Sequence, residues 1–207
     1  LFGLVQNSSA KHYKLFVLTG QSNSLGTTAG GESDPSSGVD PADGHVKFYW
    51  DNVADASNTI GDSGGVWTTL QDQQGGYYAG SATHWGPEIN FARTLYRAGV
   101  RDFGVIKASR GGGGNTNWSE SSGGHMYDHV KDTVDAASVA LEAAGDTFEI
   151  VGFMYVQGES DSSGEAAIAD TRLEELVINL RAGLEKATSM HAVAGGIAAA
   201  GGNRNAV

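Results

Sequence analysis

The chain has 207 residues, of which 40% are hydrophobic and 18% charged, and these values are typical of a globular protein. It contains 13 Lys and Arg against 24 Asp and Glu, and the formal net charge of −11 disfavours nucleic acid and anionic lipid as partners. There are no cysteines, which excludes disulfides, thiolate zinc sites and a cysteine nucleophile. No apolar run approaches the roughly 18 residues of a membrane span, so we expect no membrane partner.

Apolar runs that end in glycine or polar residues alternate along the chain with segments of helical periodicity. The runs predict strands at residues 14–19, 46–50, 103–108, 149–156 and 193–199. The periodic segments predict a helix from Gly86-Pro87-Glu88 to Gly99, one at 125–144 and one that includes Leu173 to Leu184. Residues 26–44 and 51–84 have a loop-like composition and are predicted to be loops.

The alternation of strands and helices predicts an α/β fold, a three-layer α/β/α sandwich around a parallel sheet of about five strands. Because the chain has no internal repeat and no linker, we expect one domain over residues 1–207. In such folds the functional residues lie in loops at the carboxyl ends of the strands. Polar, glycine-flanked segments occupy those positions at Gly20-Gln21-Ser22-Asn23, Gly111 to Gly114, and Gln157-Gly158-Glu159.

Ser22 follows a strand and a glycine, a position that can present its hydroxyl and its own backbone N–H at the sheet edge. That geometry suits a nucleophile whose amide also holds an oxyanion. The alternative is that Ser22 and Asn23 only cap a following helix.

A glycine amide of the 111–114 segment and the side-chain amide of Gln157 supply two further donors. Three convergent donors would form an oxyanion hole, in which removal of one donor costs about 3–4 kcal/mol of transition-state stabilisation. Taken alone, the glycine run can also be a flexible loop, and it lacks the Gly-Lys-Ser/Thr ending of a phosphate-binding loop. Glu159 and Asp161 are interpreted either as residues that assist the catalytic groups or as acidic residues of a solvated loop.

Four segments together resemble the carbohydrate acetylesterase branch of the SGNH hydrolases, which includes sialate O-acetylesterase-like domains and carbohydrate esterase family 6. They are residues 16–23 (FVLTGQSN), Gly86-Pro87-Glu88, Gly111-Gly112 with Trp118 downstream, and residues 155–161 (YVQGESD). The resemblance runs in the expected order from about residue 14 to residue 200. Its first and last segments are the most specific.

The resemblance implies a flavodoxin-like SGNH fold and hydrolysis of acetyl esters on saccharides, without metal or organic cofactor. It implies that Ser22 is the nucleophile, that Gly112 gives a backbone amide, and that Gln157 takes the role of asparagine in many relatives. It gives Glu88 a structural rather than a catalytic role. The neighbouring residues that we expect to help bind the substrate are Gln21, Asn23, Gly111 and Glu159.

The chain lacks the Asp-x-x-His segment that provides the catalytic base in this family. We expect that segment to follow residue Val207 in a longer natural chain. The alternative is a relocated base, for which His84 and His125 are the candidates because both approach the carboxyl edge of the predicted sheet. The remaining histidines lie at the opposite edge or beside an apolar helix stripe.

Two alternative functions remain open from the sequence. A non-catalytic carbohydrate-binding domain would account for the missing base and would use loop aromatics for stacking, namely Trp50, Trp67, Trp85, Trp118 and the pair Tyr77-Tyr78. An SGNH lipase or thioesterase would need a wide apolar pocket, which the polar loops disfavour. The expected substrate is an acetylated saccharide outside the cytoplasm, so we mildly prefer export of the protein. The sequence does not indicate the oligomeric state.

Overall fold

A computed structural model of the protein describes residues 9–26, 39–55, 58–75 and 83–195. A central sheet holds five parallel strands in the order β2-β7-β1-β8-β9. Their bounds are Lys47–Asp55, Phe103–Ser109, His12–Gly20, Thr147–Val156 and His191–Gly195, respectively. Two short strands, β3 (Asn58–Asp62) and β4 (Thr68–Thr69), pair with β2 in the antiparallel sense, and β5 (Gln73–Gln74) pairs with β6 (Thr83–His84) in a separate ribbon.

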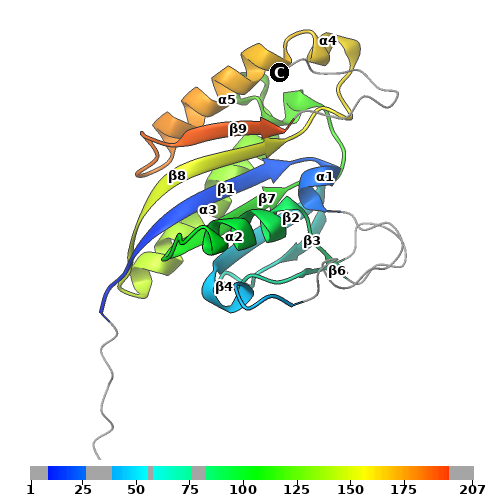
Figure 1. The fold of residues 1–207 in the computed structure, drawn as a ribbon. Helices are drawn as coiled ribbons and strands as arrows, with labels where there is room; N and C mark the ends of the chain where they lie inside the picture. The colour runs from blue at the N-terminus through cyan, green and yellow to red at the C-terminus, as the bar shows by residue number, and fades with distance from the viewer. Residues whose placement is uncertain (1–8, 27–38, 56–57, 76–82, 196–207) are drawn as a thin grey trace, which may run out of the picture.

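Helices cover both faces of this sheet (Figure 1). Helix α2 (Pro87–Arg97) lies on one face, and helices α3 (His125–Ala143) and α5 (Ala169–Gly183) lie on the other. The short elements are α1 (Ser22–Leu25), α4 (Ser163–Ala166) and the 3-10 turns η1 (Asp43–His45), η2 (Asn115–Trp118) and η3 (Glu120–Ser122). Within the described residues, none of the helices combines the length and the apolar character needed to cross a membrane.

The central strands are buried on both faces, as expected of a parallel sheet. Every residue of β7 is buried, and the apolar side chains of β1 point alternately to the two helical layers. Leu15 and Val17 pack with α3 and α5, whereas Phe16 packs with α2 against Phe103 at a ring-centroid distance of 6.2 Å. The predicted three-layer α/β/α fold with about five parallel strands is therefore confirmed.

The prediction of loop throughout residues 51–84 was wrong. Strand β2 continues to Asp55, and β3 to β6 all lie within that range or at its end. These strands are short and carry few apolar residues, so hydrophobic periodicity does not reveal them; backbone pairing to β2 and to one another forms them instead. The fifth predicted strand is present as β9, and residues 196–199 lie outside the described residues.

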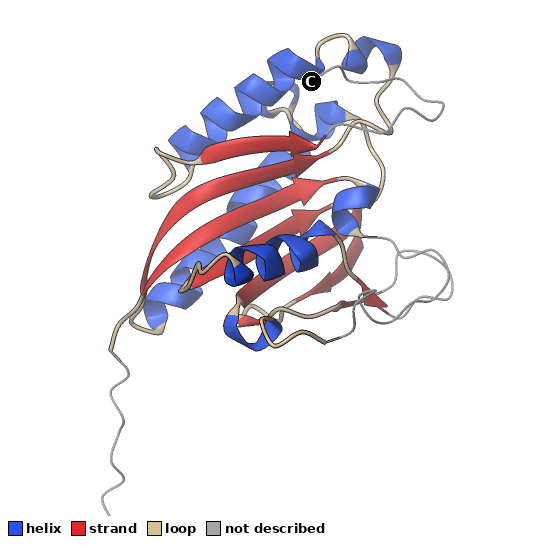
Figure 2. Cartoon of the chain, viewed as in Figure 1, coloured by secondary structure: helices blue, strands red, loops and turns tan. Residues whose placement is uncertain are grey.

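The strand register brings three loops to one level of the sheet. Gly20, the last residue of β1, pairs with Ser109 of β7 on one side and with Val156 of β8 on the other. The arrowheads of these strands point to the edge where α1 lies (Figure 2). The loops after the three strands therefore leave the sheet side by side, which is the position of active sites in open α/β sheets.

Candidate active site

Ser22 is the first residue of α1, directly after the turn that ends β1. Gly20 makes this turn with φ 141°, and a Cβ there would lie 1.9 Å from the carbonyl oxygen of Val156, so no other residue fits without moving β8. The helix N-cap is Gln21, with no side-chain capping hydrogen bond, so the alternative of Ser22 as a capping residue is not what the structure shows. Ser22 is half-buried, and among the described residues its hydroxyl has no hydrogen-bond partner.

Gln21 joins the loop after β1 to the loop after β8. Its side chain is buried, and Oε1 accepts hydrogen bonds from the backbone nitrogens of Ser160 at 3.1 Å and Gly158 at 3.4 Å. Its Nε2 donates to the Ser160 hydroxyl at 3.2 Å. These contacts fix the position of Ser22 relative to β8, whereas the expected role of Gln21 in substrate binding stays a prediction.

The glycine-rich loop after β7 is held by backbone hydrogen bonds at the two residues before Gly112. The backbone nitrogen of Arg110 donates to the carbonyl of Gly20, and that of Gly111 donates to the carbonyl of Val53. Gly112 has φ 68°, and within the described part of the chain its backbone N–H has no acceptor. Since the amide of Gly111 is occupied, Gly112 is the better placed of the two glycines to hold an oxyanion.

Gln157 follows β8 and is buried at the same edge. Its Oε1 accepts from the hydroxyl of Tyr155 at 3.3 Å, and its Nε2 donates to Asp161 Oδ1 at 2.6 Å. The other contacts of Nε2, to the carbonyl of Gly113 and to Gln21 Oε1, are 3.4 and 3.5 Å long. One amide hydrogen is thus anchored, and the second has only marginal partners in this arrangement.

Asn23 and Glu159 face each other across the two loops. The side-chain amide of Asn23 donates to Glu159 Oε1. The other carboxylate oxygen, Oε2, is buried and has no hydrogen-bond partner among the described residues. A buried acceptor without a donor is costly, so a donor on a bound ligand would stabilise it.

A polar cluster behind the glycine-rich loop was not predicted from the sequence beyond the mention of Asp161 as a helper. Asp161 is buried and accepts from Asn115 as well as from Gln157. Glu165 accepts from the Thr116 hydroxyl at 2.6 Å and from the backbone nitrogen of Ser162 at 2.9 Å. Burial alone would raise the pKa of Glu165, but these hydrogen bonds outweigh it and lower the pKa to about 2.

A buried ion pair lies against the end of α1, the short helix that begins with Ser22. Lys107 of β7 lies 3.0 Å from Glu88 Oε2, and both side chains are fully buried. Lys107 Nζ also donates to Gln73 Oε1 at 2.7 Å and to the carbonyl of Leu25, the last residue of α1, at 2.8 Å. Desolvation lowers the pKa of Lys107, and the charge of Glu88 opposes that effect. This is the structural role that was expected for Glu88.

His84 is not available as a base, because both of its ring nitrogens are in use. Nε2 lies 2.9 Å from Asn52 Nδ2, and Nδ1 bonds the carbonyl of Gly75. Burial, and then the charge of Lys107, lower the pKa of His84 to about 4, so the ring is neutral at pH 7. His125 begins α3, beyond the glycine-rich loop, and its role as base stays a prediction.

Among the described residues, the four tryptophans do not form an exposed stacking surface. Trp50 and Trp118 are buried, and Trp118 Nε1 donates to Thr19 Oγ1 at 3.0 Å inside the core. Trp67 and Trp85 are half-buried and pack against the two hydrophobic clusters of the sheet. Tyr77 and Tyr78 lie outside the described residues. The placement of the four tryptophans thus gives no support to a binding domain built on stacking.

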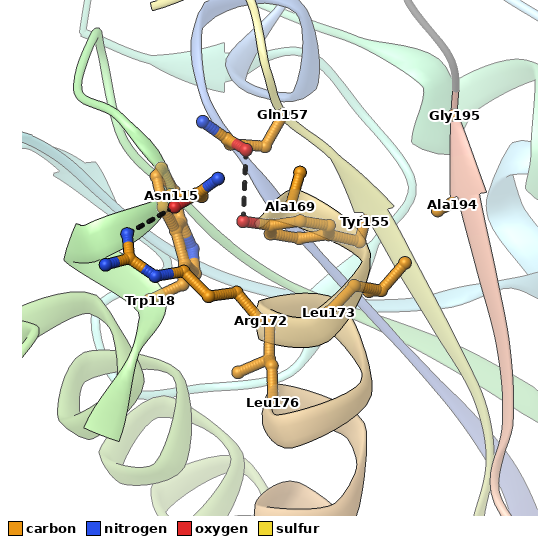
Figure 3. A pocket seen from close by; sticks show the side chains of 10 residues that line it. All are labelled: Asn115, Trp118, Tyr155, Gln157, Ala169, Arg172, Leu173, Leu176, Ala194 and Gly195. Atoms are coloured by element: carbon orange, nitrogen blue, oxygen red, sulfur yellow. Dashed lines mark hydrogen bonds between the residues drawn. The ribbon is translucent and has the colours of Figure 1, made fainter. Parts of the chain in front are cut away.

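A small cavity adjoins Gln157 between η2, α5 and the ends of β8 and β9 (Figure 3). The Trp118 and Tyr155 rings meet edge to face in it at a centroid distance of 5.9 Å, and Arg172 reaches across to Asn115. Its volume of about 10 Å³ is room for one water, so it is not a substrate pocket. Within the described residues, no group of His, Asp and Glu side chains could hold a metal ion.

Comparisons with known proteins place the chain in a family. Residues 12–207 match the family model of carbohydrate esterases described as sialic acid-specific acetylesterase. The chain belongs to this family. It is therefore a carboxylic ester hydrolase of the carbohydrate acetylesterase type. No curated protein matches the chain.

Two solved structures share the fold. A protein from Arabidopsis thaliana is 21% identical and superposes with a TM-score of 0.64, over 92% of this chain and 76% of that protein. NanS is 16% identical and superposes with a TM-score of 0.53, over 90% of this chain and 68% of NanS. At these identities the likeness establishes the fold alone.

Proposed function

We propose that the protein removes acetyl groups from O-acetylated sialic acid through an acyl-enzyme formed at Ser22. The family gives the class of substrate, and the observation that carries the mechanism is the position of Ser22 at the level where the three strand-end loops meet. There its hydroxyl has no competing partner among the described residues, and the amide of Gly112 is without an acceptor. The same family membership favours a saccharide over the long acyl chains of a lipase or thioesterase.

In this reaction Ser22 Oγ attacks the acetyl carbonyl carbon and gives up its proton to a general base. The carbonyl oxygen takes the negative charge, and the amides of Ser22 and Gly112 with the side chain of Gln157 are the donors that stabilise it. Collapse of the intermediate expels the sugar oxygen, which takes the proton from the base, and leaves the acetyl group on Ser22. Water then attacks the acetyl-serine and gives one proton to the base, which passes it to Ser22 Oγ as that oxygen leaves, and the acetyl group departs as acetic acid, which ionises to acetate.

The nucleophile can be tested directly. Ser22→Ala should lower kcat/KM for 4-nitrophenyl acetate and for O-acetylated N-acetylneuraminic acid by about 10³-fold or more, with an unchanged unfolding temperature. A fluorophosphonate should label the wild-type protein at Ser22 and leave the variant unlabelled. Ser189→Ala, an exposed serine that precedes β9 at the opposite edge of the sheet, is the matched control and should keep full activity. Undiminished turnover in Ser22→Ala would exclude the mechanism.

A further inference from the structure

Arg110 is the first residue after β7 and lies beside the nucleophile loop. Its backbone nitrogen donates to the carbonyl of Gly20 at 2.9 Å, and it is followed directly by Gly111 and Gly112. Its side chain therefore starts from the same edge of the sheet as Ser22, two residues before Gly112, whose amide is proposed to hold the oxyanion.

The guanidinium of Arg110 is only partly satisfied. Nη1 donates to Asn117 Oδ1 at 2.5 Å, while Nε is buried and has no hydrogen-bond partner in the described part of the chain. A Cβ at Gly113 would lie 2.5 Å from Nη1, so the loop carries a glycine where the guanidinium passes. The Nη2 group also has no hydrogen-bond partner in the described part of the chain and is not among the buried unpartnered atoms, so it is the side of the guanidinium that an acceptor from outside the protein can reach.

The other arginines of the described residues have their partners within the protein. Arg93, Arg97 and Arg172 each lie within 4.0 Å of a carboxylate. Arg101 and Arg181 donate to backbone carbonyls. Like Arg101 and Arg181, Arg110 forms no ion pair among the described residues, but unlike them it follows a strand at the carboxyl edge of the sheet. Its charge is thus left uncompensated at the edge where the substrate arrives.

We propose that Arg110 binds the carboxylate of an acidic sugar whose acetyl ester reacts at Ser22. This inference rests on the proposed function and adds the residue that selects a sugar acid over a neutral sugar. A planar guanidinium can hold a carboxylate through two parallel hydrogen bonds. The net charge of −11 repels anions from the protein as a whole, so recognition of an acidic sugar requires a local cation such as Arg110. A neutral acetylated sugar leaves that cation without a counter-charge.

Binding tests the proposal without any catalytic step. The wild-type protein is titrated with N-acetylneuraminic acid and with its uncharged C1 carboxamide, and the two dissociation constants are compared by calorimetry. We expect the acid to bind about tenfold or more tightly than the carboxamide, and Arg110→Gln to remove that difference. Arg110→Lys should retain only part of the difference in affinity, since an ammonium group cannot form two parallel hydrogen bonds to a carboxylate. Equal binding of acid and carboxamide by the wild-type protein overturns the proposal, whatever the variants do.

Hydrolysis gives the second readout. Arg110→Gln should raise KM for O-acetylated N-acetylneuraminic acid about tenfold and leave turnover of 4-nitrophenyl acetate within about twofold, because the nitrophenyl ester carries no carboxylate. Arg101→Gln removes an exposed arginine from the amino end of β7 and is the charge-matched control, expected to keep the wild-type preference. Equal losses on both substrates would show that Arg110 only holds the loop, and would refute the proposal. Loss of hydrolysis in the wild-type protein with the acid preference intact would instead refute the role of Ser22.

Discussion

Asp161 Oδ1 lies 2.6 Å from the side-chain nitrogen of Gln157, and the same carboxylate accepts two hydrogen bonds of 2.8 Å from Asn115. This aspartate therefore joins the loop after β8 to the loop after β7, the two loops that carry the proposed oxyanion donors beyond Ser22 itself. In the proposed mechanism Asp161 is a positioning residue, since it would act on the reaction through the Gln157 amide that it orients.

Asp161→Asn should lower kcat with little change in KM. The new side-chain amide would place a donor against a donor of Gln157 or Asn115, so that Gln157 turns away from the oxyanion. We expect kcat to fall about ten- to a hundredfold, less than the ~10²–10³-fold that follows outright removal of an oxyanion donor. Steady-state kinetics on 4-nitrophenyl acetate measure this effect. Asp170→Asn, at an exposed position in the first turn of α5, is the matched control; a rise in KM alone would argue against the positioning role.

Gly20→Ala should destabilise the protein far more than Gly99→Ala. Both glycines have positive φ, 141° and 90°, but a Cβ at Gly20 would meet the Val156 carbonyl at 1.9 Å, whereas at Gly99 nothing lies within 4 Å. Gly99→Ala should then cost only the left-handed backbone penalty of about 1–2 kcal/mol. Gly20→Ala should cost about 4 kcal/mol or more, because β1 and β8 must separate. Urea unfolding of both variants measures the difference, and equal costs would contradict the steric account.

His84 should make the protein lose stability between pH 6.5 and pH 4. Its pKa falls from 6.5 to about 4 on folding, so in this interval the unfolded chain binds the proton and the folded protein does not. The contribution of His84 to the free energy of unfolding is fully present above pH 6.5. It declines as the pH approaches 4, by about 3 kcal/mol at 1.36 kcal/mol per pH unit. The ring proton shifts of His84, followed by NMR, should titrate near pH 4; titration near pH 6.5 would rule this out. His84→Gln should flatten the stability profile in this range, whereas the exposed His191→Gln should not.

The Lys107–Glu88 pair should show strong coupling between its two partners. Lys107→Met leaves the Glu88 carboxylate buried without its cation and should cost about 3–5 kcal/mol of unfolding free energy. Glu88→Gln added to this variant removes the unpaired charge, so the double variant should be more stable than Lys107→Met alone. Lys186→Met breaks the more exposed ion pair with Glu142 and should cost about 1 kcal/mol or less. A double variant as unstable as the sum of its single changes would show that the pair is not coupled.

Much of the fold follows from the sequence. The apolar runs at 14–19, 103–108 and 149–156 indicate buried parallel strands because only a sheet covered on both faces accepts side chains that are apolar in both directions. A glycine close after such a run marks the strand end, and this pattern places Ser22, Gly112 and Gln157 at one edge of the predicted sheet. The resemblance to the carbohydrate esterases gave the expected chemistry, and the family match confirms that class.

Tertiary structure decided which polar groups at that edge are occupied and which are free. The amide of Gly111 donates to the carbonyl of Val53, whereas the amide of Gly112 has no acceptor among the described residues. Both ring nitrogens of His84 have hydrogen-bond partners, whereas Nε of Arg110 has none among the described residues. These differences arise from hydrogen bonds between residues that lie far apart in the chain, such as Asn52 with His84 and Asp161 with Asn115. Local periodicity reports only which face of an element is apolar, so it carries no information on such pairings. The sequence by itself determined the sheet edge and indicated Ser22 as the candidate nucleophile; the packing of distant loops determined which of the surrounding groups have partners within the protein.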